Sequence, residues 1–173
     1  LAVLREKGIK ATFFVLGCNG EQHNALLKQV IADGHEVGNH GYSHSLLREI
    51  SLEKYLSEVD RNEVLLGAAG AKPVLFRPPG GSYNDALVAR LQAKGYTTVL
   101  WSVDTRDWSR PPVDQVVQKA AGNLKPGQIF LFHDGQPSLP TVQAIKLLID
   151  NFRAQGYAIV PLGELLQYEE LRQ

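Results

Sequence analysis

Apolar positions along the chain recur first with helical spacing and then in short unbroken runs, and a glycine separates the two patterns five times. Glycine just past a helix fits the left-handed cap conformation, which other residues adopt at a steric cost. The helix-like stretches and their glycines are Leu1–Lys7 with Gly8, Ala25–Asp33 with Gly34, Asp85–Lys94 with Gly95, Val113–Leu124 with Gly127, and Thr141–Gln155 with Gly156. A further helix is predicted over Leu52–Ala69, with Ser51 as its N-cap.

The short apolar runs predict strands, each preceded by one of these helices. They are Ala11–Leu16, His35–Asn39, Val74–Arg77, Thr97–Val103, Gln128–His133 and Tyr157–Pro161. Runs that are apolar throughout are typical of parallel strands covered on both faces. Helices that alternate with strands predict an α/β fold, either a barrel or a doubly wound sheet. A barrel helix follows a strand, so the helix at Leu1 leads us to expect that a first strand is missing and that Thr12–Leu16 lies at a sheet edge.

Composition narrows the class of protein. The chain has 173 residues, with 18 Lys and Arg against 18 Asp and Glu, so we expect a single domain over residues 1–173. The balanced charge argues against nucleic acid or an anionic membrane as partner, and no apolar stretch is long enough for a membrane span. Cys18 is the only cysteine, which excludes an internal disulfide framework. Methionine is absent, and we therefore expect a fragment or a processed product.

Two histidines follow the predicted strand His35–Asn39 directly. His40 and His44 are four positions apart, and on a helical turn that spacing lets two imidazoles hold one metal ion. The same spacing is often incidental. Its place at the carboxyl end of a strand favours a metal site, because barrel active sites are built there.

Three other strand ends also carry polar residues. In the loop after Phe76, Arg77 could hold a carboxylate, and the backbone N–H of Gly80 or Gly81 could face an oxyanion, although the segment also suits an ordinary turn. The segment Asp104–Trp108 could tune a neighbouring pKa and wall a sugar ring, or form a solvated loop with the indole capping the core. His133 fits either a core histidine or a general acid or base. Together, four such strand ends favour an active site.

In this order, and over nearly the whole chain, these segments resemble the polysaccharide deacetylases of carbohydrate esterase family four, which share the nodulation-type deacetylase domain. The matching segments are His40–His44 for the metal-binding H-[ST]-x-x-H motif, Asp104–Trp108 for D-x-x-D-W, and Leu131–His133 for L-x-H. Arg77–Gly81 is similar to the R-x-x-P-x-G motif in an R-P-P-x-G form. Gly41 stands where Ser or Thr is usual, and Gly80 where an aromatic residue is frequent. The acidic T-F-D-D-G-P motif, on the first strand in the family, has no counterpart in this sequence.

The resemblance implies a single catalytic domain over residues 1–173, folded as a distorted (β/α) barrel of about seven strands that lacks its first strand here. It implies a hydrolase of carbon–nitrogen bonds other than peptide bonds, in carbohydrate metabolism. Such an enzyme removes N-acetyl groups from polysaccharides that contain N-acetylglucosamine, peptidoglycan or chitin oligomers, by means of a metal-activated water.

The resemblance also implies a role for each site residue. His40 and His44 would hold a divalent metal, usually zinc, together with an Asp of the missing motif. His133 would be the general acid and Asp107 would favour its imidazolium form. Arg77 would hold the catalytic Asp of the missing motif. The remaining residues would contact the reacting group, with the Gly80 N–H on the oxyanion and an apolar wall formed by Pro79, Trp108 and Leu131.

The missing Asp pair leaves alternatives open and makes activity of the chain as given doubtful. An upstream polypeptide segment would complete both the barrel and the metal site. The same chemistry would serve an esterase that removes O-acetyl groups from acetylxylan. A non-catalytic glycan-binding relative that has lost the Asp pair is the other alternative. The resemblance implies that an acetylated glycan is the partner. It also implies a protein of the cell wall that is either secreted from the cell or held in the cell envelope.

Overall fold

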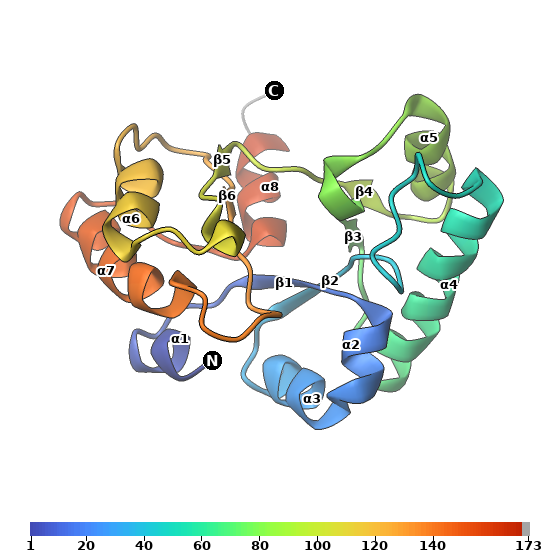
Figure 1. Ribbon diagram of the computed structural model, residues 1–173, viewed down its shortest axis with the longest axis horizontal. Coiled ribbons are helices and arrows are strands. Elements are labelled where there is room, and N and C mark those ends of the chain that lie inside the picture. The colour runs from blue at the N-terminus through green and yellow to red at the C-terminus, as the bar shows by residue number, and fades with distance from the viewer. Residues whose placement is uncertain (171–173) are drawn as a thin grey trace. The chain divides into compact units, whose positions relative to one another are not determined.

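The computed structural model describes residues 1–170 and divides into two compact units, which we describe separately. The sheet unit comprises Thr12–Leu100, and the terminal unit comprises Leu1–Ala11 together with the chain from Trp101 onward. Figure 1 shows the elements of both units along the chain. The expectation of one domain over residues 1–173 stays a prediction, and its last three residues lie outside the described part.

A four-stranded parallel sheet forms the centre of the sheet unit. Its strands are β1 (Thr12–Val15), β2 (Glu36–Asn39), β3 (Leu75–Phe76) and β4 (Thr97–Thr98), in the order β1-β2-β3-β4. Thr12 pairs with Glu36 and Leu75 pairs with Thr97, all in parallel. β1 lies at the edge of this sheet, as expected for the run Thr12–Leu16.

Helices connect these strands, as the parallel arrangement requires. They are α2 (Gly17–Gln22), α3 (Asn24–Ala32), α4 (Leu52–Ala68) and α5 (Asp85–Ala93), with a 3-10 turn, η1, at Pro79–Gly81. The Ser51 side chain caps α4 as predicted, accepting a hydrogen bond from the Lys54 N–H at 3.3 Å. Asn84 caps α5 in the same way. The core packs α4 and α5 against β3, through Tyr55, Leu56, Val59, Phe76, Leu87, Leu91 and Tyr96.

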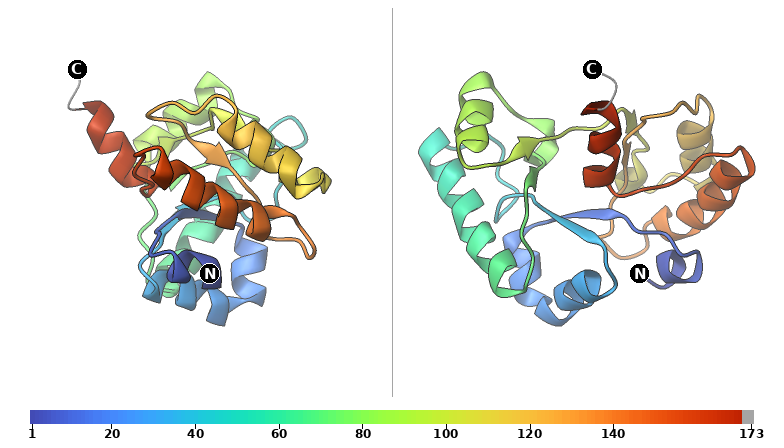
Figure 2. Two further views of the ribbon diagram at one scale, coloured as in Figure 1. Left: turned by 90° about the vertical axis from the view of Figure 1, so that its left-hand side faces the viewer. Right: turned by 180° about the vertical axis from the view of Figure 1, so that it is seen from behind.

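The terminal unit holds a second, two-stranded parallel sheet of β5 (Val103–Asp104) and β6 (Phe130–Leu131). Its helices are α1 (Ala2–Glu6), α6 (Val113–Ala121), α7 (Thr141–Ala154) and α8 (Leu162–Glu170), with a 3-10 turn, η2, at Asp107–Ser109. Helices α6 and α7 lie side by side (Figure 2) and share a core of Val116, Ala120, Ala144, Leu148 and Phe152. The turn η2 begins at Asp107, three positions after the end of β5 at Asp104.

The α/β prediction is confirmed, and so are most of the local signals on which it depends. Four of the predicted cap glycines follow a helix end with positive φ: Gly8, Gly34, Gly95 and Gly156. Gly127 also has positive φ, but it caps no helix, because α6 ends at Ala121 with Gly122 as its C-cap. Within residues 1–170, the strands form two parallel sheets rather than a closed barrel, and no helix is both long and apolar enough to cross a bilayer.

Two strand predictions and one helix need correction. The run Thr97–Val103 is not one strand: β4 pairs with β3, whereas β5 pairs with β6 in the other sheet. The run Tyr157–Pro161 forms no ladder; Tyr157 and Ile159 pack against the α6–α7 core instead, and burial alone explains its apolar pattern. Helix α2 was not predicted because its glycines disfavour a helix. A Cβ at Gly17 would lie 2.3 Å from the Tyr42 ring, so packing requires the glycine there.

Candidate active site

His40 and His44 lie on the turn that follows β2, in the sheet unit. Their ring centroids are 5.3 Å apart, with the ring planes at 73°. The backbone of His44 has a φ of 65°, in the left-handed region. The structure therefore brings the two predicted metal ligands together.

The tautomer of His40 suits a metal ligand. Its Nδ1 lies 2.5 Å from the backbone oxygen of Arg77, and since a carbonyl can only accept, Nδ1 carries the proton and donates it. A metal-binding histidine is commonly oriented by a hydrogen bond from the ring nitrogen that does not bind the ion. Here that nitrogen is Nδ1, which leaves Nε2 for the ion. Zinc usually takes at least three protein ligands, and residues 1–170 hold no cluster of three or more His, Cys, Asp or Glu side chains suited to a metal. The two imidazoles thus fit part of a metal site.

A buried polar network that was not predicted from the sequence lies beneath this turn. Asn39 is fully buried, and its side-chain oxygen accepts hydrogen bonds from the Gly41 N–H and from Asn62, both at 2.9 Å. Its amide group donates to the Val59 carbonyl at 3.0 Å and to the Tyr96 hydroxyl at 3.1 Å. Burial raises the pKa of Tyr96 to about 12, so its hydroxyl stays protonated. The network fixes the point at which the turn leaves β2.

Arg77 is buried at the end of β3 and is not free to move. Its Nη2 donates to the Leu100 carbonyl at 2.8 Å, and its guanidinium carbon lies 4.2 Å from the centre of the Phe14 ring. Burial lowers the pKa of Arg77 to about 10, which still leaves the side chain charged at neutral pH. A buried cation of this kind attracts a carboxylate.

The loop after Arg77 turns through η1. Pro79 is buried and Gly80 is exposed, with a φ of 60°. The hydrogen bonds that close the turn are donated by the N–H groups of Gly81, to Pro78 at 2.9 Å, and Ser82, to Pro79 at 3.2 Å. The exposed Gly80 N–H takes no part in closing the turn, so it suits the predicted contact with an oxyanion.

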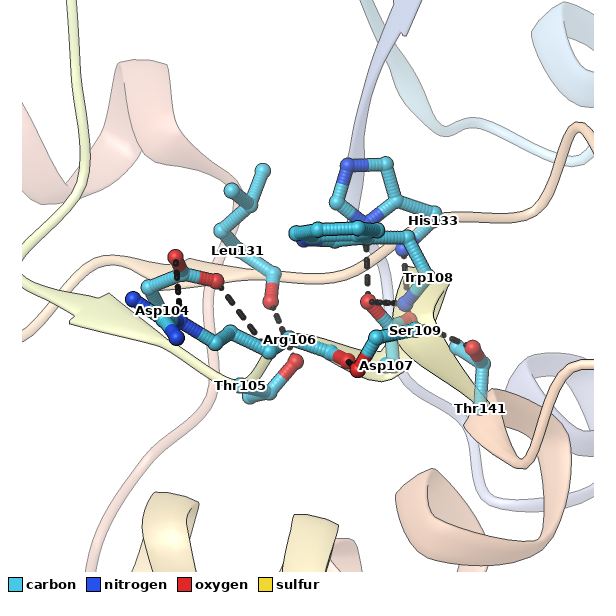
Figure 3. A network of polar contacts seen from close by, with 9 residues as sticks. All are labelled: Asp104, Thr105, Arg106, Asp107, Trp108, Ser109, Leu131, His133 and Thr141. Atoms are coloured by element: carbon cyan, nitrogen blue, oxygen red, sulfur yellow. Dashed lines mark hydrogen bonds and ion pairs between the residues drawn. The ribbon is translucent and has the colours of Figure 1, made fainter. Parts of the chain in front are cut away.

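In the terminal unit, Asp107 and His133 form a direct pair (Figure 3). His133 Nδ1 lies 2.7 Å from Asp107 Oδ1, while the other ring nitrogen points away from the carboxylate. The His133 backbone N–H also donates to Asp107 Oδ2, at 2.8 Å. The Asp107 side chain is fully buried, and that of His133 is 39% exposed. This arrangement fixes a proton on Nδ1 and leaves Nε2 outside the contact with Asp107.

Two further donors complete the hydrogen bonding of Asp107. The Trp108 N–H donates to Oδ1 at 2.9 Å, and the Thr141 hydroxyl donates to Oδ2 at 2.5 Å. Burial by itself would raise the pKa of Asp107, but the hydrogen bonds from His133 and Thr141 outweigh it and hold the pKa below its usual value. Asp107 is therefore an anion at neutral pH. Thr141, at the start of α7, was predicted only as a helix residue, because nothing in its local sequence indicates a partner 34 residues away.

The two remaining predicted residues of this unit lie beside the pair. Trp108 is 50% exposed, so about half of the residue faces solvent. The backbone oxygen of Leu131 accepts a hydrogen bond from Thr105 at 2.8 Å, which ties β6 to the segment that carries Asp107. Within each unit, the predicted residues therefore gather at strand ends: His40, His44, Arg77, Pro79 and Gly80 in one, and Asp107, Trp108, Leu131 and His133 in the other.

Comparison with known proteins adds an independent finding. Residues 1–99 match the family described as polysaccharide deacetylase. The chain is 38% identical over 172 residues to a peptidoglycan-N-acetylglucosamine deacetylase of Bacillus cereus, covering 98% of this chain and 81% of that protein.

Solved structures agree with this result. The peptidoglycan deacetylase PdaC from Bacillus subtilis superposes with a TM-score of 0.89 at 29% identity, over 99% of this chain and 83% of that chain. A Bacillus anthracis protein described as a CE4 family pseudoenzyme also has a TM-score of 0.89, at 31% identity, over 95% of this chain and 58% of that one. The α/β fold is therefore shared with a deacetylase and with a protein described as a pseudoenzyme.

Proposed function

The chain belongs to the polysaccharide deacetylase family, and from that premise we propose that it is a metal-dependent hydrolase of N-acetyl groups on N-acetylglucosamine-containing glycans. Peptidoglycan is the favoured substrate, since a similar protein of Bacillus cereus is named for its deacetylation. A substrate of this kind would place the protein outside the cell or in the envelope.

His40 and His44 would hold a divalent metal, with zinc favoured by two nitrogen ligands. When bound, such an ion acts as a Lewis acid and makes water a nucleophile at neutral pH. A carboxylate would complete this site, and an upstream polypeptide segment would supply it. The Nδ1 hydrogen bond of His40 to Arg77 supports the proposal, because it holds the ring in the tautomer that a ligand needs.

His133 would protonate the leaving amine. Its Nδ1 proton is held by Asp107, so only Nε2 can exchange a proton with a substrate. An anionic partner stabilises the imidazolium that forms when Nε2 takes up a proton. The same nitrogen can then give that proton to the amine as its bond to the acetyl carbon breaks.

The other predicted site residues would orient the catalytic carboxylate and bind the substrate. Arg77 would hold the carboxylate that accepts a proton from the attacking water. The Gly80 N–H would donate to the tetrahedral oxyanion. Trp108, with Pro79 and Leu131, would contact the acetyl methyl group and the sugar ring, a role that an exposed indole suits.

The single observation that carries this proposal is the Asp107–His133 pair, at 2.7 Å, with a buried anion behind a half-exposed imidazole. A purely structural histidine does not need an anionic partner with four hydrogen-bond donors. A second candidate is a non-catalytic glycan-binding protein. It is favoured by the lack of a third metal ligand within residues 1–170 and by the likeness to a pseudoenzyme.

Acetate release from N-acetylglucosamine oligomers separates the two candidates. The assay uses the purified protein together with the proposed upstream segment, and Zn²⁺ is added. The enzyme should then release acetate, and a chelator should stop the release. Binding of the oligomers without acetate release, at any zinc concentration, would support the non-catalytic candidate and overturn the enzymatic one.

A further inference from the structure

Beyond the proposed metal ligands, the geometry points to Glu58 as the residue that positions His44. We propose that the Glu58 carboxylate, on α4, clamps the turn on both sides of His44 and so keeps its imidazole beside that of His40. This inference rests on the proposed metal site. It adds a positioning residue from a helix that none of the recognised motifs includes.

The contacts of Glu58 are directed at the two neighbours of His44. The Ser43 hydroxyl lies 2.8 Å from both carboxylate oxygens, and the Ser43 N–H donates to Oε2 at 3.1 Å. On the other side, the Ser45 hydroxyl donates to Oε1 at 3.2 Å. The two serine hydroxyls are also 2.8 Å from each other. A single side chain thus ties the residues before and after His44 to α4, beside which the turn runs (Figure 1).

The turn needs such a clamp because His44 is strained. Its φ of 65° lies in the left-handed region, which a residue with a Cβ occupies only where its surroundings hold it there. His44 is itself exposed, so core packing does not hold it. The hydrogen bonds to Glu58 supply that constraint from outside the turn.

His40 is fixed differently. Its ring bonds to the Arg77 carbonyl, and Asn39 anchors its backbone through the Gly41 N–H. Loss of Glu58 should therefore release His44 and leave His40 in place. This difference separates a positioning role from a general loss of stability, which would affect both rings.

Zinc titration followed by NMR of the histidine ring protons tests the proposal in the 173-residue chain, where weak binding can be measured. In Glu58→Ala, the Kd for Zn²⁺ should rise about tenfold, the lower end of the effect of removing a residue that orients a ligand. Without zinc, the ring signals of His44 should shift further than those of His40, which change only through the ring current of their neighbour 5.3 Å away. Glu53→Gln, on the exposed face of the same helix, should change neither.

Further variants guard against a misfolded protein. Glu58→Gln should retain part of the zinc affinity, because an amide oxygen can still accept from one serine. The Ser43→Ala/Ser45→Ala double variant should reproduce the loss with Glu58 intact, and adding Glu58→Ala should cost little more, since all three act through one contact. An unchanged Kd and unmoved His44 signals in Glu58→Gln and in the double variant would overturn the clamp.

The same titration tests the metal site separately. His40→Ala and His44→Ala should each abolish the zinc-dependent shifts. If they do and the Glu58 and serine variants bind zinc like the unaltered chain, only the clamp is wrong. If the histidine variants bind zinc normally, the proposed metal site itself is wrong.

Discussion

Asp107 holds His133 by two contacts at once, one from the ring Nδ1 at 2.7 Å and one from the backbone N–H at 2.8 Å. The imidazole is therefore fixed in position as well as in tautomer. Preorganisation of this kind costs no further ordering when a substrate binds. It makes the pair the most direct place to test the proposed chemistry.

Replacing His133 should affect turnover and spare metal binding. In the natural protein, His133→Ala should lower kcat by about 10²–10⁴-fold, the range for loss of a general acid. Zinc content, measured by atomic absorption, should not change, because His133 is not a proposed ligand. His23→Ala, which removes an exposed histidine between α2 and α3, is the control. Full activity in His133→Ala would leave the acid unassigned.

The acidity of Asp107 should depend on Thr141. The Thr141 hydroxyl is one of the groups that lower the pKa of Asp107, so Thr141→Val should raise that pKa. A pH titration of the Asp107 carboxyl carbon by ¹³C NMR measures the shift. Thr105→Val is a matched control, since this buried threonine bonds to the Leu131 carbonyl instead. An unaltered titration in Thr141→Val would mean that the hydroxyl does not act on the carboxylate.

Stability of the terminal unit should depend on pH through the same residue. Because folding lowers the pKa of Asp107, its ionised form stabilises the folded state above about pH 4, and this contribution is lost as the pH falls through the folded pKa. Asp107→Asn should therefore unfold at a lower urea concentration at pH 7. Its free energy of unfolding should be lower by about 1–3 kcal/mol, because hydrogen-bond donors are left unpaired. The difference from the unaltered chain should shrink in acid.

Tryptophan fluorescence follows this transition selectively. Both tryptophans, Trp101 and Trp108, belong to the terminal unit. Asp104→Asn, at an exposed carboxylate, should show little effect at either pH. A loss of stability in Asp107→Asn that is the same at pH 7 and at pH 3 would contradict the linkage.

The Asn39 network beneath the turn that carries His40 and His44 should stabilise the sheet unit. Asn62→Leu would leave the Asn39 oxygen and the Val15 carbonyl each without the hydrogen bond that Asn62 donates, at 2.9 Å and 2.8 Å. The free energy of unfolding should fall by about 0.5–1.5 kcal/mol for each of these hydrogen bonds, since the Gly41 and His40 N–H groups still donate to the two acceptors. Ser57→Ala, on the exposed side of the same helix, should stay within about 0.5 kcal/mol. Urea unfolding followed by far-UV circular dichroism compares the two.

Features that depend on neighbours in the sequence could be predicted, and features that depend on distant partners could not. Four of the five glycine caps and the Ser51 cap follow from the conformation of single residues and were correct. The network of Asn39 joins residues 23 and 57 positions away, and no local pattern indicates them. The run Thr97–Val103 was misread for the same reason, because its two ends pair with strands of different sheets.

The residues of the candidate active site also divide into those that the sequence indicates and those that only the structure reveals. His40, His44 and His133 stand out in the sequence because each follows an apolar strand, and the carboxyl end of a strand is where a site is expected. Thr141 and Glu58 lie within helices, where a polar residue is usually a solvated one. Only the folded chain shows that each of them bonds to a segment carrying a predicted site residue.

Gly80 should tolerate no side chain without loss of activity. Its φ of 60° makes Gly80→Ala cost about 1–2 kcal/mol in the left-handed region, and the new Cβ would lie 3.0 Å from a methyl group of Leu46. The turn should relax and move the N–H that we assign to the oxyanion, so kcat should fall by about 10²-fold or more, as when one oxyanion donor is lost.

Gly67→Ala is the control: a Cβ at this exposed helical glycine would meet no neighbouring atom within 4 Å, and alanine there should stabilise the helix by about 0.5–1 kcal/mol. Acetate release and urea unfolding of both variants separate the two effects. A Gly80→Ala variant that is destabilised but fully active would show that the Gly80 N–H does not contact the reacting group.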